Sequence, residues 1–136
     1  EGLRKTLFSV IREEVAQRLA ERQQNMTVYA QQAMNYIDRH YAEVITLELI
    51  AEKLHISPVH LSVVFKRETG MNYSKYLANV RVEKSKALLK QPDMNLTQAA
   101  NAVGYDSPSY FGSLFRKYTG LKPSEYRRLH QQDIGE

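Results

Sequence analysis

The side chains that most often carry enzyme chemistry are scarce in this chain of 136 residues. It contains no Cys, so a thiolate nucleophile, a disulfide framework and a cysteine-ligated metal or iron–sulfur site are excluded. The four His residues, which lack metal-ligand spacing, are His40, His55, His60 and His130. A Ser/His/Asp arrangement and a phosphate-cradling Gly-rich loop are also absent from the sequence. The sequence therefore predicts a protein that is not an enzyme and uses no cofactor or metal.

Basic residues are concentrated in one part of the chain. The whole chain has a net charge of +4, whereas residues 57–130 hold twelve Lys and Arg against five acidic residues, a net of +7. Residues 1–56 carry seven basic and eight acidic residues and are close to neutral. A polyanion is therefore the expected partner, and we expect it to bind to residues 57–130.

Two segments in the basic part, residues 57–68 and 107–118, have the spacing of short helices with one apolar face. Phe65 and Phe115 point inward, and small residues followed by basic ones point outward. The outward residues that we expect to approach base edges in a DNA major groove are Val59, Ser62, Val63, Ser109, Gly112 and Ser113. The residues that we expect to reach DNA phosphates are Ser57, Lys66, Arg67, Ser107, Arg116 and Lys117. The repetition of this pattern favours DNA binding over an ordinary solvated helix face.

These two segments belong to an internal repeat. Seven of the twenty positions from 57 to 76 are identical to the residues fifty positions later. The identical residues in the first copy are Ser57, Pro58, Phe65, Thr69, Gly70, Ser74 and Tyr76. They fall where a helix starts, packs or ends, so the chain is predicted to contain two copies of one helix-turn-helix unit.

The turn residues support two short helices in each copy. Thr46 is the predicted N-cap of the first helix, and Ser57 caps the second with Pro58 at its first position. Gly104 supplies the positive φ angle that the second turn needs, and His55 occupies the equivalent place in the first turn. His55 is therefore interpreted as a turn residue rather than a chemical group.

A helix stop and a joining helix complete the repeat. Gly70 is expected to end the second helix in a Schellman motif, with Met71 packed on Phe65. A joining helix is then predicted over residues 74–91, and its length of about 27 Å is compatible with one turn of DNA, about 34 Å. Both outward faces could thus enter successive major grooves.

The N-terminal part is also predicted to be helical, and no strand is expected. An amphipathic helix is predicted from Leu3 to Gln23, and a second helix from Thr27 to Tyr41. The polar residues 23–25 between them indicate a helix end or a hinge. The first of these helices either mediates dimerisation and signalling or packs on its own domain.

The order of these motifs resembles the DNA-binding domain of the AraC/XylS family of bacterial transcription regulators. The resemblance covers residues 30–128, and the most specific matches are Gly104-Tyr105, Tyr110-Phe111, Phe115, Gly120, Pro123 and Tyr126-Arg127. It implies an all-α, homeodomain-like domain of seven helices that bends DNA and activates transcription by contacting RNA polymerase. It also implies that the six base-approaching residues named above occupy the family's base-reading positions.

The resemblance leads to a domain organisation and a set of partners. The predicted parts are residues 1–25 (linker or signal helix), 26–73 (first helix-turn-helix subdomain), 74–91 (connecting helix), 92–130 (second subdomain) and 131–136 (tail). The arrangement is similar to regulators of the YesN type, which implies an upstream sensor or receiver domain, a cytoplasmic location and a homodimer through residues 3–23. The expected partners are promoter DNA and RNA polymerase, without a membrane.

Two other functions remain compatible with the sequence. One is a helical protein-interaction module whose basic face binds an acidic partner. The other is a nucleic-acid-binding protein without sequence preference. Both share the basic patch of residues 57–130, so sequence-selective binding has to be measured.

Overall fold

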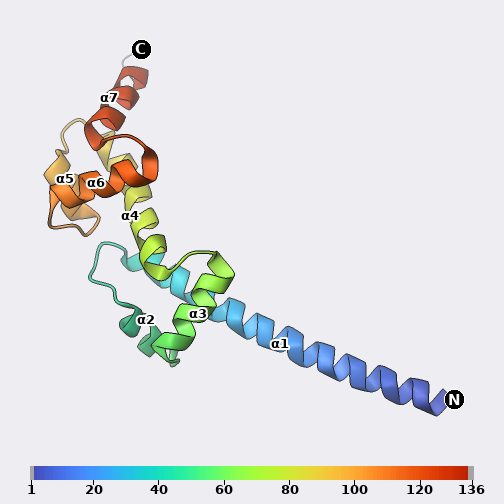
Figure 1. Cartoon of the computed structure of the whole chain (residues 1–136). Helices are drawn as coiled ribbons and strands as arrows, with labels where there is room; N and C mark the ends of the chain where they lie inside the picture. Colours follow the sequence, from blue (N-terminus) through green and yellow to red (C-terminus); the bar gives the residue numbers. More distant parts are fainter. Residues whose placement is uncertain (1, 135–136) are drawn as a thin grey trace.

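The computed structural model describes the backbone of residues 2–134 and the side chains of residues 10–14, 16–17 and 28–131. Over these residues the protein is all-helical, as predicted, with no strand. The helices are α1 (Gly2–His40), α2 (Leu47–Leu54), α3 (Pro58–Thr69), α4 (Tyr73–Leu89), α5 (Leu96–Ala102), α6 (Pro108–Thr119) and α7 (Pro123–Ile134). Two clusters of short helices lie along α4, and α1 extends away from them (Figure 1).

The N-terminal part forms one helix rather than two, so the predicted end or hinge at residues 23–25 is wrong. α1 runs without interruption for 39 residues. Gln is a good helix former, and neither Gly nor Pro interrupts residues 3–40, so a polar run has no reason to end the helix. Among the described side chains of its first half, residues 10–14 and 16–17 are all exposed. They do not pack on the rest of the chain, which excludes for them the alternative of a helix folded back on its own domain.

The first helical cluster surrounds its own hydrophobic core. We call it the first unit, comprising residues 28–40 of α1 together with α2 and α3. Its buried residues are Ala33, Ile37, Ile45, Ile50, Ala51, Leu61, Phe65 and Leu77. Ile45 and Ile50, which flank the N-cap Thr46, are both buried, as expected of a hydrophobic staple. The rings of Phe65 and Tyr76 pack edge to face, with 5.4 Å between the ring centroids.

The second cluster, α5 to α7, is the second unit and has a separate core. Its buried residues are Val82, Leu89, Ala99, Ala100, Val103, Phe111, Phe115 and Tyr126. The joining helix α4 belongs to both cores, because Leu77 lies in the first, and Val82 and Leu89 lie in the second. α4 starts at Tyr73 behind the N-cap Asn72, and it ends at Leu89, two residues before the predicted end.

The predicted turns are confirmed. His55 has φ of 58° and Gly104 has φ of 101°, so both copies use the left-handed region at the same place. Thr46 Oγ1 accepts the N–H of Leu49 at 3.1 Å, which confirms the N-cap of α2. Within the described residues, no helix is both long and apolar enough to cross a membrane.

The predicted Schellman motif at Gly70 is wrong in detail. The N–H of Gly70 donates to the carbonyl of Lys66, which is the single bond of the simpler left-handed stop. The N–H of Met71 donates instead to Thr69 Oγ1, and the Thr69 hydroxyl donates to the carbonyl of Phe65. The threonine thus satisfies the group that a Schellman motif would have paired. The Thr-Gly pair, present in both copies, is the sequence feature that could have predicted this threonine-assisted helix end.

Candidate DNA-binding surface

α3 presents one buried and one exposed face, as predicted. Its start is held by Ser57, whose Oγ accepts the N–H of His60 at 3.1 Å. The buried face consists of Leu61, Val64 and Phe65. Val59 is 75% exposed and Val63 is 55% exposed, and Ser62 between them is exposed as well. Burial is favourable for valine, so two exposed valines on one helix face are candidates for contact with another molecule.

α6 repeats this arrangement in the second unit. Ser107 Oγ accepts the N–H of Tyr110 at 3.2 Å, and Phe111 and Phe115 are fully buried. Ser109 and Ser113 are exposed, and Gly112 between them is partly exposed. A Cβ added at Gly112 would meet no atom within 4 Å, so the glycine leaves open space above the helix. Another molecule can therefore approach the α6 backbone closely.

The outward face of α6 forms one wall of a surface hollow of ≈ 380 Å³. The residues around it are Leu96, Pro108, Ser109, Gly112, Ser113, Arg116, Lys122, Pro123 and Ser124. All three small residues predicted in α6 thus share a concave surface with Arg116. Lys122, at the start of α7, was not predicted. It lies six residues beyond Arg116, outside the helix on which the sequence argument relied.

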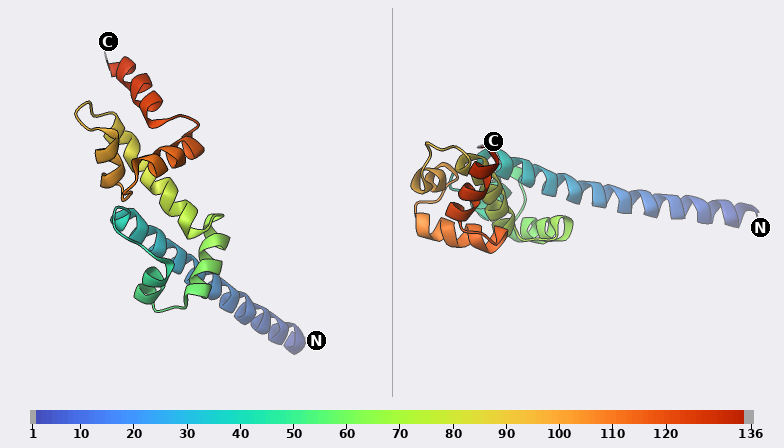
Figure 2. Two further views of the ribbon diagram at one scale, coloured as in Figure 1. Left: turned by 60° about the vertical axis from the view of Figure 1, so that its left-hand side comes forward. Right: turned by 90° about the horizontal axis from the view of Figure 1, so that it is seen from above.

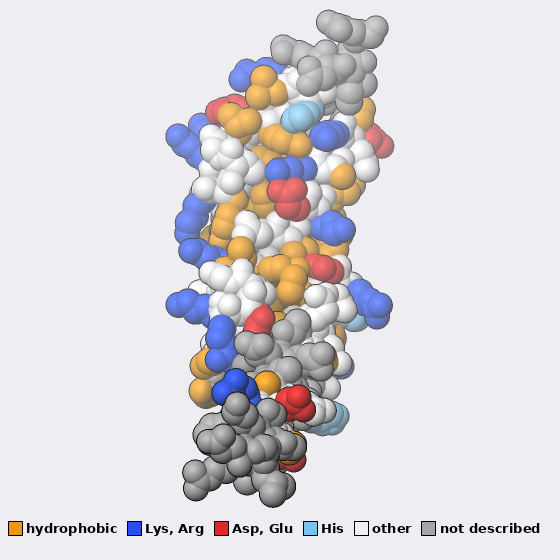
Figure 3. Space-filling model, turned by 90° about the vertical axis from the view of Figure 1, so that its right-hand side faces the viewer, with side chains coloured by type: hydrophobic (Ala, Val, Ile, Leu, Met, Phe, Trp, Pro, Cys, Tyr) orange, Lys and Arg blue, Asp and Glu red, His pale blue; other side chains and the backbone are white. Residues whose placement is uncertain are grey.

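Basic side chains follow the small residues in both helices. Lys66 and Arg67 lie in the last turn of α3, and Arg116 and Lys117 lie in the last turn of α6. All four are exposed. Cations at a helix C-terminus also interact favourably with the helix dipole. Figure 3 shows Lys and Arg side chains along one edge of the molecule over most of its length. A phosphate backbone could contact such an edge in both units.

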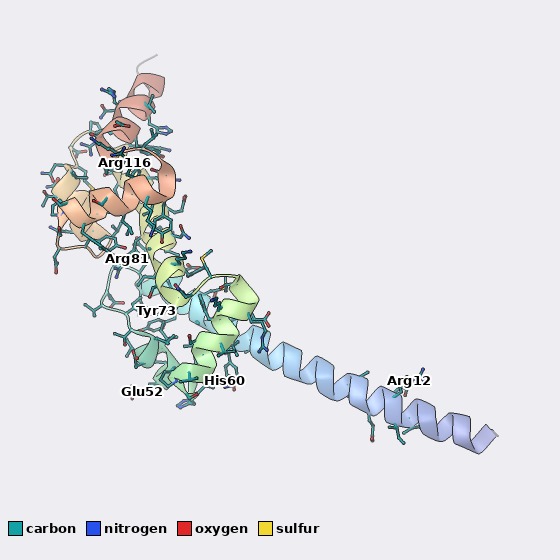
Figure 4. All side chains as sticks on the ribbon, viewed as in Figure 1. Arg12, Glu52, His60, Tyr73, Arg81 and Arg116 are labelled. Carbon is teal, nitrogen blue, oxygen red and sulfur yellow. The ribbon has the colours of Figure 1, made fainter. Side chains whose placement is uncertain are left out.

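α3 and α6 lie on the same side of the molecule. Figure 2 shows both helices along one side when the protein is viewed from above. α4, which joins the two units, has 17 residues and is therefore about 26 Å long. Figure 4 shows His60 on α3 and Arg116 on α6 in separate units, with Arg81 between them. This arrangement leaves both helices accessible from one side of the molecule.

Two predicted phosphate contacts also have a structural task. The hydroxyls of Ser57 and Ser107 accept N–H groups of their own helices, so they stabilise the starts of α3 and α6. The ring of His60, in α3, lies 6.0 Å from that of Tyr29 in α1, centroid to centroid. This contact joins α1 directly to α3. The sequence had no signal for it, because the two residues are 31 positions apart.

His, Asp and Glu side chains do not gather into a metal site in the part of the chain that the structure describes. No group of three or more His, Asp or Glu side chains in that part of the chain could hold a metal ion. Burial raises the pKa of Tyr105, and the nearby charge of Arg81 partly opposes the rise. The arrangement thus offers exposed helices and cations for binding.

Comparison with known proteins agrees with this geometry. A family model described as a helix-turn-helix domain matches residues 50–129. The uncharacterised HTH-type transcriptional regulator YijO of Escherichia coli is 39% identical over 102 residues, which are 75% of this chain and 36% of YijO. The chain therefore spans about a third of the length of that regulator.

Solved structures show the same fold. The C-terminal domain of AraT, a response regulator of Geobacillus stearothermophilus, has a TM-score of 0.71 and 37% identity, covering 74% of this chain and 84% of that domain. The DNA-binding domain of AdpA in complex with a target DNA has a TM-score of 0.73 at 22% identity, covering 79% of this chain and 96% of that domain, and it supports the fold alone. The helix-turn-helix unit is repeated, and the family model matches across both copies. The chain therefore belongs to the AraC-type family of helix-turn-helix DNA-binding transcription regulators.

Proposed function

We propose that this domain binds promoter DNA in a sequence-selective way by placing α3 and α6 in successive major grooves. The observation that carries the proposal is the presence of two exposed helices on one side of the molecule, each with small residues followed by basic ones. Val59, Ser62 and Val63 in α3 would meet base edges in one groove. Ser109 and Ser113 would do so in the next, with Gly112 admitting close approach.

Phosphate contacts would hold the domain in register on the duplex. Lys66 and Arg67 in α3, and Arg116 and Lys117 in α6, stand at the ends of the two exposed faces. The hydroxyls of Ser57 and Ser107 lie at the helix starts and would donate to phosphate while they accept their backbone N–H groups. Such contacts raise the affinity for all sequences, whereas base contacts supply the preference.

DNA selection separates this function from its rivals. Duplexes with a randomised central region would be selected by the full chain, and one selected duplex would be titrated against a scrambled duplex of equal composition. We expect tighter binding of the selected duplex at every salt concentration. Equal affinity for both duplexes would reject sequence-selective binding in favour of a nonspecific binder. If the chain retains no duplex during the selection, a protein-interaction module would be favoured.

We further propose that the protein activates transcription in the cytoplasm by contacting RNA polymerase and that it has no enzymatic activity. The membership of the AraC-type family supports a role at promoters. In vitro transcription from a promoter carrying the selected site should increase when the chain is added. A decrease would identify a repressor instead.

α1 would link the DNA-binding units to a partner and to a signal. Its described residues in the first half are exposed, including the apolar Val10 and Ile11. We propose that a second copy of the chain covers this face. The likeness to the C-terminal domain of a response regulator supports an arrangement in which α1 relays a signal from an upstream sensor or receiver domain. The Tyr29–His60 contact gives α1 a direct path to α3.

A further inference from the structure

Arg81 in the joining helix α4 is one of the two buried polar side chains among the described residues, with 9% of its surface exposed. Its Nε donates to the carbonyl of Tyr41 at 2.6 Å, and its Nη2 donates to the carbonyl of Glu43 at 2.9 Å. Both carbonyls belong to the loop between α1 and α2, in the first unit. A guanidinium is suited to this task because its planar donors are fixed relative to one another.

The same guanidinium also contacts the second unit. Its Cζ lies 4.9 Å from the centroid of the Tyr105 ring, within the range of a cation–π interaction. A Cβ placed on Gly104 would lie 3.0 Å from the Arg81 guanidinium and 3.1 Å from the carbonyl oxygen of Ala42. The turn of the second unit therefore lies tightly against both Arg81 and the α1–α2 loop. Figure 4 shows Arg81 at this junction.

Together, these contacts form a second connection between the units besides α4. We call it the clasp, and its residues are Tyr41, Ala42, Glu43, Arg81, Gly104 and Tyr105. The Tyr41 side chain packs against the cores of both units. The two cores pack on different stretches of α4, with Leu77 in the first core and Leu89 in the second, so α4 alone restrains the angle between the units only through the packing of each unit on the helix. A contact beside the helix axis restrains that angle further.

We propose that Arg81 is a positioning residue that sets the angle between α3 and α6 and thereby determines which spacing of two DNA half-sites the protein accepts. The spacing part rests on the function proposed above. One added base pair moves a half-site by about 3.4 Å along the duplex and rotates it by about 36° around the axis. If the angle between α3 and α6 is fixed, the two helices cannot follow such a change. If that angle can vary, they can.

Arg127 provides a matched control within the second unit. Its Nε donates to the carbonyl of Leu89 at 2.8 Å, and its Nη2 donates to the carbonyl of Met94. It thus makes the same kind of paired bond as Arg81, but Leu89 and Met94 both pack in the second core. Arg127→Lys should therefore reduce stability without changing how the two units sit relative to each other.

The first test measures the geometry without DNA. Because the chain has no Cys, spin labels can be attached at Glu52→Cys in α2 and Thr97→Cys in α5, both exposed positions. Electron–electron distance measurements should give one narrow distribution in the otherwise wild-type chain and with Arg127→Lys. With Arg81→Lys, which keeps the charge but loses the paired geometry, the distribution should broaden or shift. An Arg81→Lys distribution that superimposes on the wild type would overturn the proposal.

The second test measures the spacing preference on DNA. A duplex selected by the wild-type chain would be compared with versions in which one base pair is inserted between its two halves. The wild type and Arg127→Lys should bind the duplex with the insertion about 100-fold more weakly than the selected duplex, because they can no longer engage both halves at once. For Arg81→Lys the loss of affinity should be less than about tenfold. Equal losses for all three proteins would overturn the role of Arg81 in spacing. If no duplex is selected, the proposed function fails. The distance measurement still shows whether Arg81 fixes the angle between the two units.

Discussion

At the level of single residues, short side chains occupy the positions proposed to read bases. Serine can donate to or accept from several bases, and valine can contact the methyl group of thymine, so each contact discriminates modestly. We therefore expect much of the sequence preference to come from the shape and deformability of the DNA. The open space above Gly112 fits this interpretation, because it favours close approach of the backbone over a specific side-chain contact.

Removing a phosphate contact should change the overall affinity for DNA, whereas removing a base contact should change the sequence preference. Arg116→Ala is expected to weaken binding to selected and scrambled duplexes alike and to reduce the slope of log affinity against log salt by about one. Ser109→Ala should change the ranking of sequences and leave that slope unchanged. Lys90→Ala, which removes an exposed cation at the end of α4, serves as the control. If Ser109→Ala weakens all duplexes equally, the assigned face of α6 is wrong.

Tyr76 should make stability depend on alkaline pH. Its hydroxyl donates to Asp38 Oδ1 at 3.2 Å. Burial and then the charge of Asp38 raise its pKa from 10.0 to about 12. Between these two values the folded state keeps a proton that the unfolded state has lost, so the free energy of unfolding falls as the pH rises through this range. Below the unfolded value the contribution is fully present.

Urea unfolding at about pH 9 and about pH 11 would measure this loss. Tyr76→Phe removes the titrating group and should make the change between the two pH values smaller. Tyr29→Phe, which removes the hydroxyl of an α1 tyrosine whose ring packs on His60, is the control. An identical pH dependence in Tyr76→Phe and the wild type would contradict the assignment.

At the level of elements, the short helices depend on their caps. α5 has only seven residues, and a helix of that length is unstable without help from its ends. Asn95 Oδ1 accepts the N–H of Gln98 at 2.7 Å, and Gln98 Oε1 accepts the N–H of Asn95 at 2.9 Å. This capping box pairs two N–H groups that would otherwise lack partners at the helix start.

Asn95→Ala should therefore lower the free energy of unfolding by about 1 kcal/mol. Asn101→Ala is the matched control, because Asn101 is an exposed residue of the same helix outside its cap, and it should change stability by less than about 0.5 kcal/mol. Urea denaturation followed by circular dichroism gives both values. Equal effects of the two substitutions would show that the capping box does not stabilise α5.

At the level of the whole molecule, α1 extends beyond the two units with apolar side chains in water. Val10 is 49% exposed and Ile11 is 52% exposed, and the helix is 39 residues long. A helix in a protein gains most of its stability by packing its apolar face on another element, so this part of α1 is expected to pair with a second chain. Such pairing would place the α3 and α6 helices of both chains on one DNA molecule.

Sedimentation equilibrium should therefore give the mass of two chains for the wild type. Ile11→Asp puts a charge on the apolar face and should give the mass of one chain. Gln17→Asp adds the same charge at another exposed position of α1 and should leave the pair intact. A single-chain mass for all three proteins would exclude dimerisation through α1.

The sequence alone was sufficient for the repeated units. Three kinds of feature depend on residues within about four positions of one another. They are the N-caps at Thr46 and Ser57, the left-handed turns at His55 and Gly104, and the two faces of α3. Local backbone geometry and helical periodicity determine such features, so they can be read along the chain. The family resemblance came from the same local signals, and the match over residues 50–129 confirmed it.

Only the tertiary structure decided how the units are joined. In sequence Arg81 looks like any basic residue on a helix surface, yet it bonds to carbonyls about forty residues earlier in the chain. Lys122 likewise joins the hollow beside α6 only because α7 starts next to that helix. Periodicity shows which face of a helix is buried, but which distant segment covers that face depends on how the folded chain brings them together.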